Sequence, residues 1–194
     1  ALPGAANYIL FSDADVEQGC AGGRAADCLE RGTRLLDQAR REEAQSPDFG
    51  RSGFTRPETV VQAYRRAEGW LAKGCDGGLA PACRTLGLSY DDRRGTDRDP
   101  LAAAPLFRKA CDAGEALGCY SLGHVYEEGR APQKQKTFTI AMTPSGDNAN
   151  RITTWEDDWS DPSKVIKRDP AQAVAYYVKG CELGSRDACE YAGS

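Results

Sequence analysis

The sequence predicts an all-α fold: a right-handed α/α solenoid of four disulfide-closed helix hairpins, with a β-hairpin inserted between the third and fourth. Three observations carry this prediction: cysteine pairs of constant spacing, glycines at constant offsets from them, and a repeat interval of 36 residues. Each pair encloses seven residues, and the pairs are Cys20/Cys28, Cys75/Cys83, Cys111/Cys119 and Cys181/Cys189. The 194 residues therefore repeat one unit four times within a single domain.

Other residues recur around the cysteines. The third residue after each first Cys is glycine, and so is the fourth residue after each second Cys. Three units also carry a lysine two residues before the first Cys and an acid one residue after it. The glycines are Gly23, Gly78, Gly114 and Gly184, then Gly32, Gly87, Gly123 and Gly193.

The spacing of the units gives the domain organisation. First cysteines lie 55, 36 and 70 residues apart, which indicates a 36-residue unit with insertions of 19 and 34 residues. A period of this length is typical of helical repeat arrays. We expect repeats at about residues 12–45, 57–95, 99–130 and 169–194, with the larger insertion at 131–168.

Each unit is predicted to be a pair of helices, A and B. Before the first Cys, apolar or small residues recur three and four apart, which indicates one buried stripe on helix A. Helix A begins at Asp99-Pro100 and again at Asp169-Pro170, where an N-cap acid precedes proline in the first turn. The glycine after the first Cys ends helix A in the left-handed conformation. The glycine on helix B lets a helix A approach closely.

Pro105 interrupts this pattern in the third repeat. A proline inside a helix removes one backbone hydrogen bond and clashes with the preceding turn. We expect either a kink at Pro105 or a helix that starts nearer Ala104, which would make Asp99-Pro100 a turn.

The constant spacing places one thiol on the last turn of helix A and the other on the first turn of helix B. Neighbours across such a turn reach the Cα separation that a disulfide requires, so we expect four bridges, each within its own unit. Reduced buried cysteines are one alternative. Zinc binding is another, although the pattern lacks Cys-x-x-Cys ligand pairs and the chain has one histidine.

The motifs Lys109-Ala110-Cys111-Asp112-Ala113-Gly114 and Gly118-Cys119-Tyr120-Ser121-Leu122-Gly123 resemble the Sel-1-like repeat family of tetratricopeptide-type solenoids, and within it the Helicobacter cysteine-rich proteins. The resemblance covers about 130 of the 194 residues. It implies repeats that each hold a disulfide between their two helices. Repeat arrays are scaffolds whose partners are set by surface residues, so the resemblance specifies the fold more closely than the function.

Composition narrows the compartment and the partners. A net charge of −4 argues against nucleic acid as the main ligand, and no apolar run reaches membrane-spanning length. Eight paired cysteines predict an oxidising compartment: periplasm, cell surface, secreted space or, in a eukaryote, the mitochondrial intermembrane space. The start Ala1-Leu2-Pro3, without Met, is what signal-peptide removal leaves, and a trimmed chain would begin in the same way.

Two segments outside the repeat lie near the N-terminal half. The apolar run Tyr8-Ile9-Leu10-Phe11 is expected to cover the open end of the first repeat, with a partner-docking arm as the alternative. Residues 40–56 are expected to continue helix B and then form a polar loop.

The second insertion is the most individual part of the chain. Phe138, Ile140 and Met142 alternate with polar residues, and a turn-forming stretch separates them from a second β-prone run that ends at Trp155. This pattern predicts a β-hairpin within a helical solenoid. Beyond it, Trp155 and Trp159 flank three acids.

The role of this hairpin has three readings. An isolated hairpin is marginal in water, so it is either a flap packed on the solenoid or a recognition element for a partner. Exposed aromatics on long loops favour recognition, which makes Gln133 to Asp161 the candidate partner-specific element. Calcium binding by the acids is a third reading, but their spacing does not follow an EF-hand.

A second candidate surface is the concave face, which we expect helix A residues to line. Basic groups recur there although the chain is acidic, so the face is expected to receive an acidic segment of a partner. A merely solvated face is the alternative. The residues are Arg66, Lys73, Lys109, Gln172 and Lys179.

Catalysis finds little support in the sequence. His124 is the only histidine and falls within helix B, where surface or groove placement is expected rather than a role as general base. Gly-x-Ser-x-Gly, His-Glu-x-x-His, Ser-x-x-Lys, Ser-Asp-Asn and Lys-Thr-Gly motifs are absent. No catalytic, metal-binding or cofactor-binding residue is therefore expected.

These observations favour a non-enzymatic extracytoplasmic adaptor that binds a protein partner, in one form as a subunit of a larger assembly. The alternative is implied by the family resemblance alone: a cell-envelope enzyme, or a binder of peptidoglycan-like or β-lactam ligands.

Overall fold

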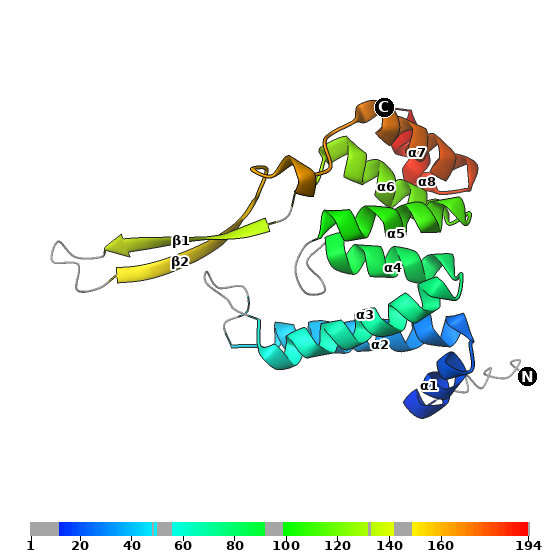
Figure 1. The fold of residues 1–194 in the computed structure, drawn as a ribbon, viewed down its shortest axis with the longest axis horizontal. Helices are drawn as coiled ribbons and strands as arrows, with labels where there is room; N and C mark the ends of the chain where they lie inside the picture. Colours follow the sequence, from blue (N-terminus) through cyan, green and yellow to red (C-terminus); the bar gives the residue numbers. More distant parts are fainter. Residues whose placement is uncertain are drawn as a thin grey trace, which may run out of the picture.

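The structure is a computed structural model. It describes residues 12–47, 49, 56–91, 99–131, 133–141 and 149–193, and for 133–141 and 149–156 it describes the backbone. Helices in this part of the chain form four stacked antiparallel hairpins, so the predicted solenoid is confirmed (Figure 1). The hairpins are α1 (Asp13–Ala21) with α2 (Ala25–Ala44), α3 (Glu58–Asp76) with α4 (Ala80–Asp91), α5 (Pro100–Asp112) with α6 (Ala116–Glu128), and α7 (Pro170–Glu182) with α8 (Arg186–Ala192).

Helix boundaries follow the predicted signals. Asp99 caps α5 and Asp169 caps α7, since each carboxylate accepts a hydrogen bond from the backbone N–H three residues on, at 3.1 and 3.0 Å. Each A helix ends in a turn whose glycine has φ between 85° and 96°. Glycine adopts this left-handed conformation without the penalty that a Cβ imposes.

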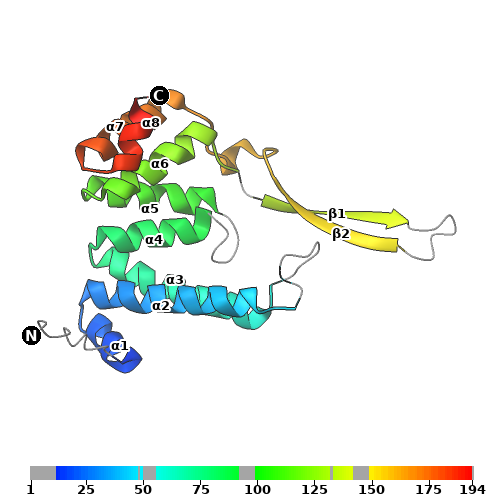
Figure 2. The same ribbon diagram turned by 180° about the vertical axis from the view of Figure 1, so that it is seen from behind.

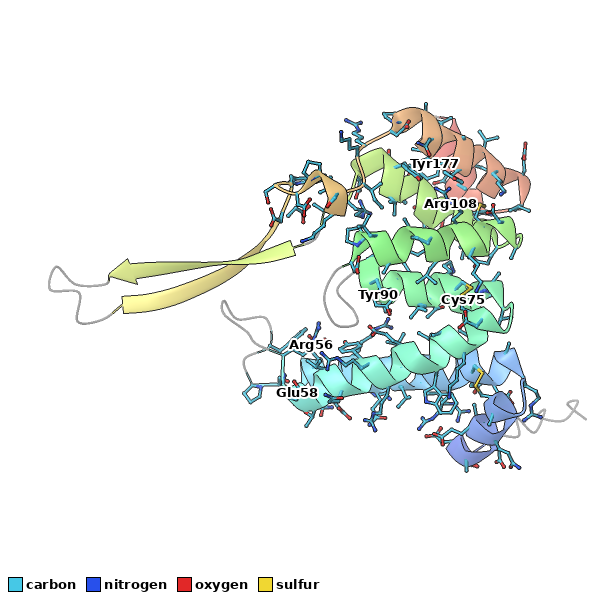
Figure 3. All side chains as sticks on the ribbon, viewed as in Figure 1. Arg56, Glu58, Cys75, Tyr90, Arg108 and Tyr177 are labelled. Carbon is cyan, nitrogen blue, oxygen red and sulfur yellow. A yellow bond between two sulfur atoms is a disulfide. The ribbon has the colours of Figure 1, made fainter. Side chains whose placement is uncertain are left out.

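The four predicted disulfides are present, and each joins the two helices of one hairpin. Their Cα–Cα distances are 4.5 to 4.8 Å, so the bridges are local to each repeat. All eight cysteines are bonded in this way. The sulfur pairs follow the edge of the solenoid opposite to the β-hairpin, with Cys75 among them (Figure 3).

A glycine on each internal B helix sets the distance to the next repeat. A Cβ added at Gly32 would lie 2.6 Å from Leu71, at Gly87 2.6 Å from Phe107, and at Gly123 2.5 Å from Tyr177. These three side chains are at most 2% exposed and occupy the same position, four residues before the first Cys. The predicted close approach is therefore made by helix A of the following repeat.

Pro105 departs from one of its two expected effects. α5 begins at Pro100 and continues through Pro105 to Asp112, so the expected later start near Ala104 is wrong. The Asp99 cap anchors the first turn, and Pro105 is the sixth helical residue. Its missing N–H leaves one carbonyl, that of Leu101, without a helical donor.

α2 is the elongated B helix that the sequence predicts, with 20 residues against 12 in α4. Its last turns pack on α3, where the Glu43 carboxylate accepts hydrogen bonds from Tyr64 Oη and Arg56 Nε, both at 2.7 Å. Burial, and then the hydrogen bond to Glu43, raise the pKa of Tyr64 to about 12. Most of the expected loop after α2, and the N-terminal run ending at Phe11, lie outside the described residues.

In the second insertion the structure has two antiparallel strands, β1 (Gln133–Ala141) and β2 (Ala149–Asp157), followed by a 3₁₀ turn (Pro162–Lys164). Each strand extends beyond the run expected from alternation, and Met142 lies outside the described residues. The hairpin projects away from the helices rather than folding back over them (Figures 1 and 2). The reading as a flap packed on the solenoid is therefore wrong.

Candidate functional site

A depression of about 480 Å³ lies on α5 where the second insertion rejoins the solenoid. One stripe of α5 lines it, together with Ile166 from the returning segment. Leu101, Ala104, Pro105 and Ile166 give the apolar part of the lining, and Leu101 is 45% exposed. Arg108, Lys109 and Asp112 supply the polar part. An apolar surface with charged groups beside it suits a peptide side chain better than a reacting small molecule.

Arg108 fixes one wall of the depression. Its guanidinium donates a hydrogen bond of 2.8 Å to Tyr126 Oη on α6. Tyr126 stacks on Tyr176 of α7, with ring centroids 5.7 Å apart and planes within 7°. Arg108 and the neighbouring Tyr177 lie in this upper part of the solenoid (Figure 3). The wall thus joins three helices into one rigid surface.

The root of the β-hairpin is fastened to the same region. Arg130 and Ile166 exchange two backbone hydrogen bonds of 2.8 Å, which bring the two ends of the insertion together. The buried Arg130 guanidinium donates to both carboxylate oxygens of Asp91, at 2.8 and 3.5 Å, and to Glu128 at 2.6 Å. The insertion is therefore anchored to α4, in the preceding repeat.

The repeat geometry continues across the insertion. The Asp169 N–H donates to the Tyr126 carbonyl at 2.7 Å, as the Asp99 N–H donates to the Tyr90 carbonyl at 3.0 Å. The same link spans nine residues in one repeat and 43 in the next. The hairpin is thus added between two positions that the solenoid already holds.

The predicted apolar residues of the hairpin do not share one face. The register places Phe138 opposite Ile152 and Gln135 opposite Trp155. Because successive strand residues alternate between faces, Trp155 occupies a register position of opposite parity from Phe138 and Ile140. The grouping of Trp155 with Phe138 and Ile140 on one contact surface is wrong, and the two faces of the hairpin differ.

Trp159 lies at the hairpin root. It is 51% exposed, and its Cη2 atom is 3.4 Å from the position of a Cβ at Gly129. The neighbouring acids Asp158 and Asp161 accept hydrogen bonds from Ser160 and Ser163 within tight local turns. These bonds from Ser163 lower the pKa of Asp161. Across the described residues, no cluster of three metal-ligating side chains is found.

The predicted basic residues are exposed on the A helices, but two of them already have acidic partners. Lys109 Nζ lies 3.3 Å from Asp76, and Lys179 Nζ lies 2.8 Å from Asp112. Each lysine thus reaches back to the acid that follows the first Cys of the preceding repeat. Such exposed pairs contribute about 0 to 1 kcal/mol and reduce the free positive charge of this face.

Lys73 and Arg66 lie outside this ladder of ion pairs. The residue of the first repeat that corresponds to Asp76 is Ala21, and Lys73 Nζ instead lies 4.3 Å above the centre of the Trp70 ring. Arg66 is exposed on α3. A role for Arg66, Lys73, Lys109 and Lys179 in binding an acidic partner stays a prediction.

A cluster around His124 was not foreseen from the sequence. Its ring lies 4.6 Å from Tyr120, 5.6 Å from Tyr177 and 4.9 Å from Tyr191, measured between centroids. Its Nδ1 is 3.3 Å from Glu127, which accepts a hydrogen bond of 2.5 Å from Tyr177 Oη. Burial, and then Glu127, raise the pKa of Tyr177. These contacts account for the histidine as a packing residue.

Three stretches of the chain, residues 80–115, 116–137 and 163–185, match the family model for the Sel1 repeat. These stretches are Sel1 repeats. The first of them groups α4 with α5, so it spans the junction between a B helix and the next A helix. The comparison with curated proteins gave no match.

Solved structures of Sel1 repeats share the fold. A Sel1 repeat protein from Oxalobacter formigenes is 18% identical, with a TM-score of 0.55 over 93% of this chain and 96% of its own. The protective antigen c5321 of uropathogenic Escherichia coli is 16% identical, with a TM-score of 0.55 over 93% of this chain and 28% of its own. Helicobacter pylori cysteine rich protein B is 17% identical, with a TM-score of 0.45 over 93% and 97%. At these identities the likeness shows the fold.

In the described part of the chain, no helix combines the length and apolar character needed to cross a bilayer. Four disulfides fit an extracytoplasmic, oxidising compartment.

Proposed function

We propose that this chain is a non-enzymatic scaffold that binds a protein partner across the α5 depression and the adjoining β-hairpin. One observation carries this proposal: Ile166, which closes the hairpin root against Arg130, also lines the depression. The two candidate elements therefore form one continuous surface.

The projecting hairpin supports partner binding on physical grounds. A two-stranded hairpin is marginally stable alone, and neither strand packs extensively on a helix among the described elements. A partner that covers the strands would supply the missing burial. Exposed Trp159 beside the root is of the residue type that most often dominates interface energies.

The compartment and the chemistry complete the proposal. The partner is extracytoplasmic, in the periplasm, at the cell surface or in the secreted space, because disulfides persist there; in a eukaryote the intermembrane space is equivalent. The scaffold acts within a larger assembly. A fluorescent penicillin that labelled the purified protein would instead favour the β-lactam-binding alternative.

The test removes the hairpin while keeping its anchor. Replacing residues 132–164 with Gly-Gly-Ser-Gly preserves the Arg130–Ile166 pair and the Arg130–Asp91 contact. We expect unchanged helical circular dichroism and at least about tenfold weaker binding to the partner captured from the source organism. Full affinity in a folded deletion variant would refute the recognition role, and unfolding would make the hairpin a structural element.

A matched pair of substitutions tests the depression. Leu101 on α5 and Leu117 on α6 are both exposed leucines, at 45% and 39%. Leu101→Asp should weaken capture by at least about fivefold because it places a charge beside the apolar lining, whereas Leu117→Asp should leave capture unchanged. Equal effects of the two substitutions would place the interface elsewhere.

A further inference from the structure

The end face formed by α7 and α8 carries the same features that, inside the solenoid, hold the next repeat. At the three internal junctions, the side chain four residues before the first Cys covers the glycine of the preceding B helix. The corresponding glycine on the end face is Gly193. A Cβ added there would meet no atom closer than the Cys189 carbonyl oxygen, at 3.8 Å.

The disulfide at this end is also uncovered. The second cysteines Cys28, Cys83 and Cys119 are at most 3% exposed, whereas Cys189 is exposed. Part of the cover inside the solenoid comes from the small residue before the next first Cys. A Cβ at Gly74 would lie 3.4 Å from Cys28 Cβ, and one at Gly180 would lie 3.3 Å from Cys119 Cβ.

The charges of the end face correspond to those of the internal junctions. Glu182 occupies the position of Asp76 and Asp112, which bind Lys109 and Lys179 of the following repeat. Glu190 occupies the position of Arg84, which binds Glu115 of the following repeat at 2.9 Å. The end face thus carries an acid at a site where the α4–α5 junction has a base.

We propose that the end face of Glu182, Cys189, Glu190 and Gly193 binds helix A of a repeat hairpin in a partner chain. The internal junctions specify that helix: a large apolar residue, lysine two positions later, then glycine or alanine, as in Leu71-Ala72-Lys73-Gly74, Phe107-Arg108-Lys109-Ala110 and Tyr177-Val178-Lys179-Gly180. The partner carries a basic residue eight positions after the apolar one, because Glu190 faces that site. This surface is separate from the depression and the β-hairpin.

A second copy of this chain fits the end face less well. Its first A helix has Val16 and Gln18 at the two specifying positions, so the lysine is missing, and Val16 is already buried. Arg24, the base at the third position, is bound to Asp27 at 2.7 Å. The occupant is therefore a partner's helix rather than α1.

The test uses a synthetic, disulfide-closed hairpin of residues 99–128 as the probe, with Glu115→Arg to supply the base. Titrated into isotope-labelled protein, it should shift amide resonances at Glu182, Glu190 and Gly193. Gly193→Leu should weaken binding at least about tenfold because the added side chain occupies the place of Phe107. Lys109→Glu in the probe should weaken it about two- to fivefold, and Glu182→Lys in the protein should restore it.

A fused version removes dependence on the folding of the probe. Residues 88–130 appended after Gly193, in place of Ser194, continue the B helix in register because Gly193 corresponds to Gly87. Reduction of Cys181–Cys189 should slow at least about tenfold in this fusion. An unchanged reduction rate together with no resonance shifts would overturn the proposal and make the end face a solvated cap. Self-association that Gly193→Leu abolishes would overturn it in favour of a second copy.

Discussion

Replacing Gly87 with alanine tests the contact that sets the spacing between repeats. The added Cβ would lie 2.6 and 2.8 Å from two ring carbons of Phe107, a side chain with no exposed surface. The ring is held from all sides, so it cannot move away without disturbing α5. Overpacking of this kind costs about 1 to 3 kcal/mol.

Gly69→Ala is the matched control. Gly69 also lies inside a helix, α3, but a Cβ there would meet nothing within 4 Å. Both substitutions gain about 1 kcal/mol of helix propensity, so this gain cancels in the comparison. The free energy of unfolding of Gly87→Ala should therefore lie about 1 to 3 kcal/mol below that of Gly69→Ala.

The assay is urea unfolding with the disulfides intact, followed by circular dichroism. Phe107→Ala alone should cost about 3 to 5 kcal/mol. Adding Gly87→Ala to Phe107→Ala should cost less than it does in the wild type, since the cavity accepts the new methyl group. Equal stabilities of Gly87→Ala and Gly69→Ala would refute the reasoning.

Three further predictions concern single groups. Under limiting reductant, differential alkylation should modify Cys189 before Cys83 and Cys119, because only Cys189 among them is exposed; simultaneous modification would contradict this order. The pKa of Tyr64 is raised to about 12, so its contribution to stability is complete below the ordinary tyrosine pKa near 10 and is lost as pH rises through 12. Wild-type protein should therefore lose more stability than Tyr64→Phe over that range, and parallel losses would remove the Glu43 contact from the account. Arg130→Met should destabilise by about 3 kcal/mol because it strands Asp91, whose side chain is 10% exposed, and Asp91→Leu should recover most of that loss; a neutral Arg130→Met would mean that the hairpin is not anchored there.

Local patterns made the hairpins and their disulfides predictable. The cap acids, the turn glycines and the cysteine spacing each act within one repeat, so the sequence displays them directly. The glycine on each B helix was recognised as a point of close approach, and its partner proved to lie in the next repeat. That partner depends on stacking, which local patterns do not contain.

The candidate site was less predictable because it combines distant segments. Lys109 and Asp76 stand 33 residues apart, three fewer than the repeat interval, and that constant offset was the available signal. The face of Trp155 depends on strand register, which alternation within one strand leaves open. The depression needs Ile166 beside Leu101, and the His124 cluster needs Tyr177 and Tyr191 from the next repeat.

Site-specific photo-crosslinking tests the central claim, that one partner spans the hairpin and the α5 depression. Benzoylphenylalanine would replace Trp155, Leu101 or, as the control, Leu117, and cross-linked products would be identified by mass spectrometry. The account predicts that the same protein cross-links at Trp155 and at Leu101 but not at Leu117. Cross-linking of that protein at Leu117 alone, or of different proteins at Trp155 and Leu101, would contradict it.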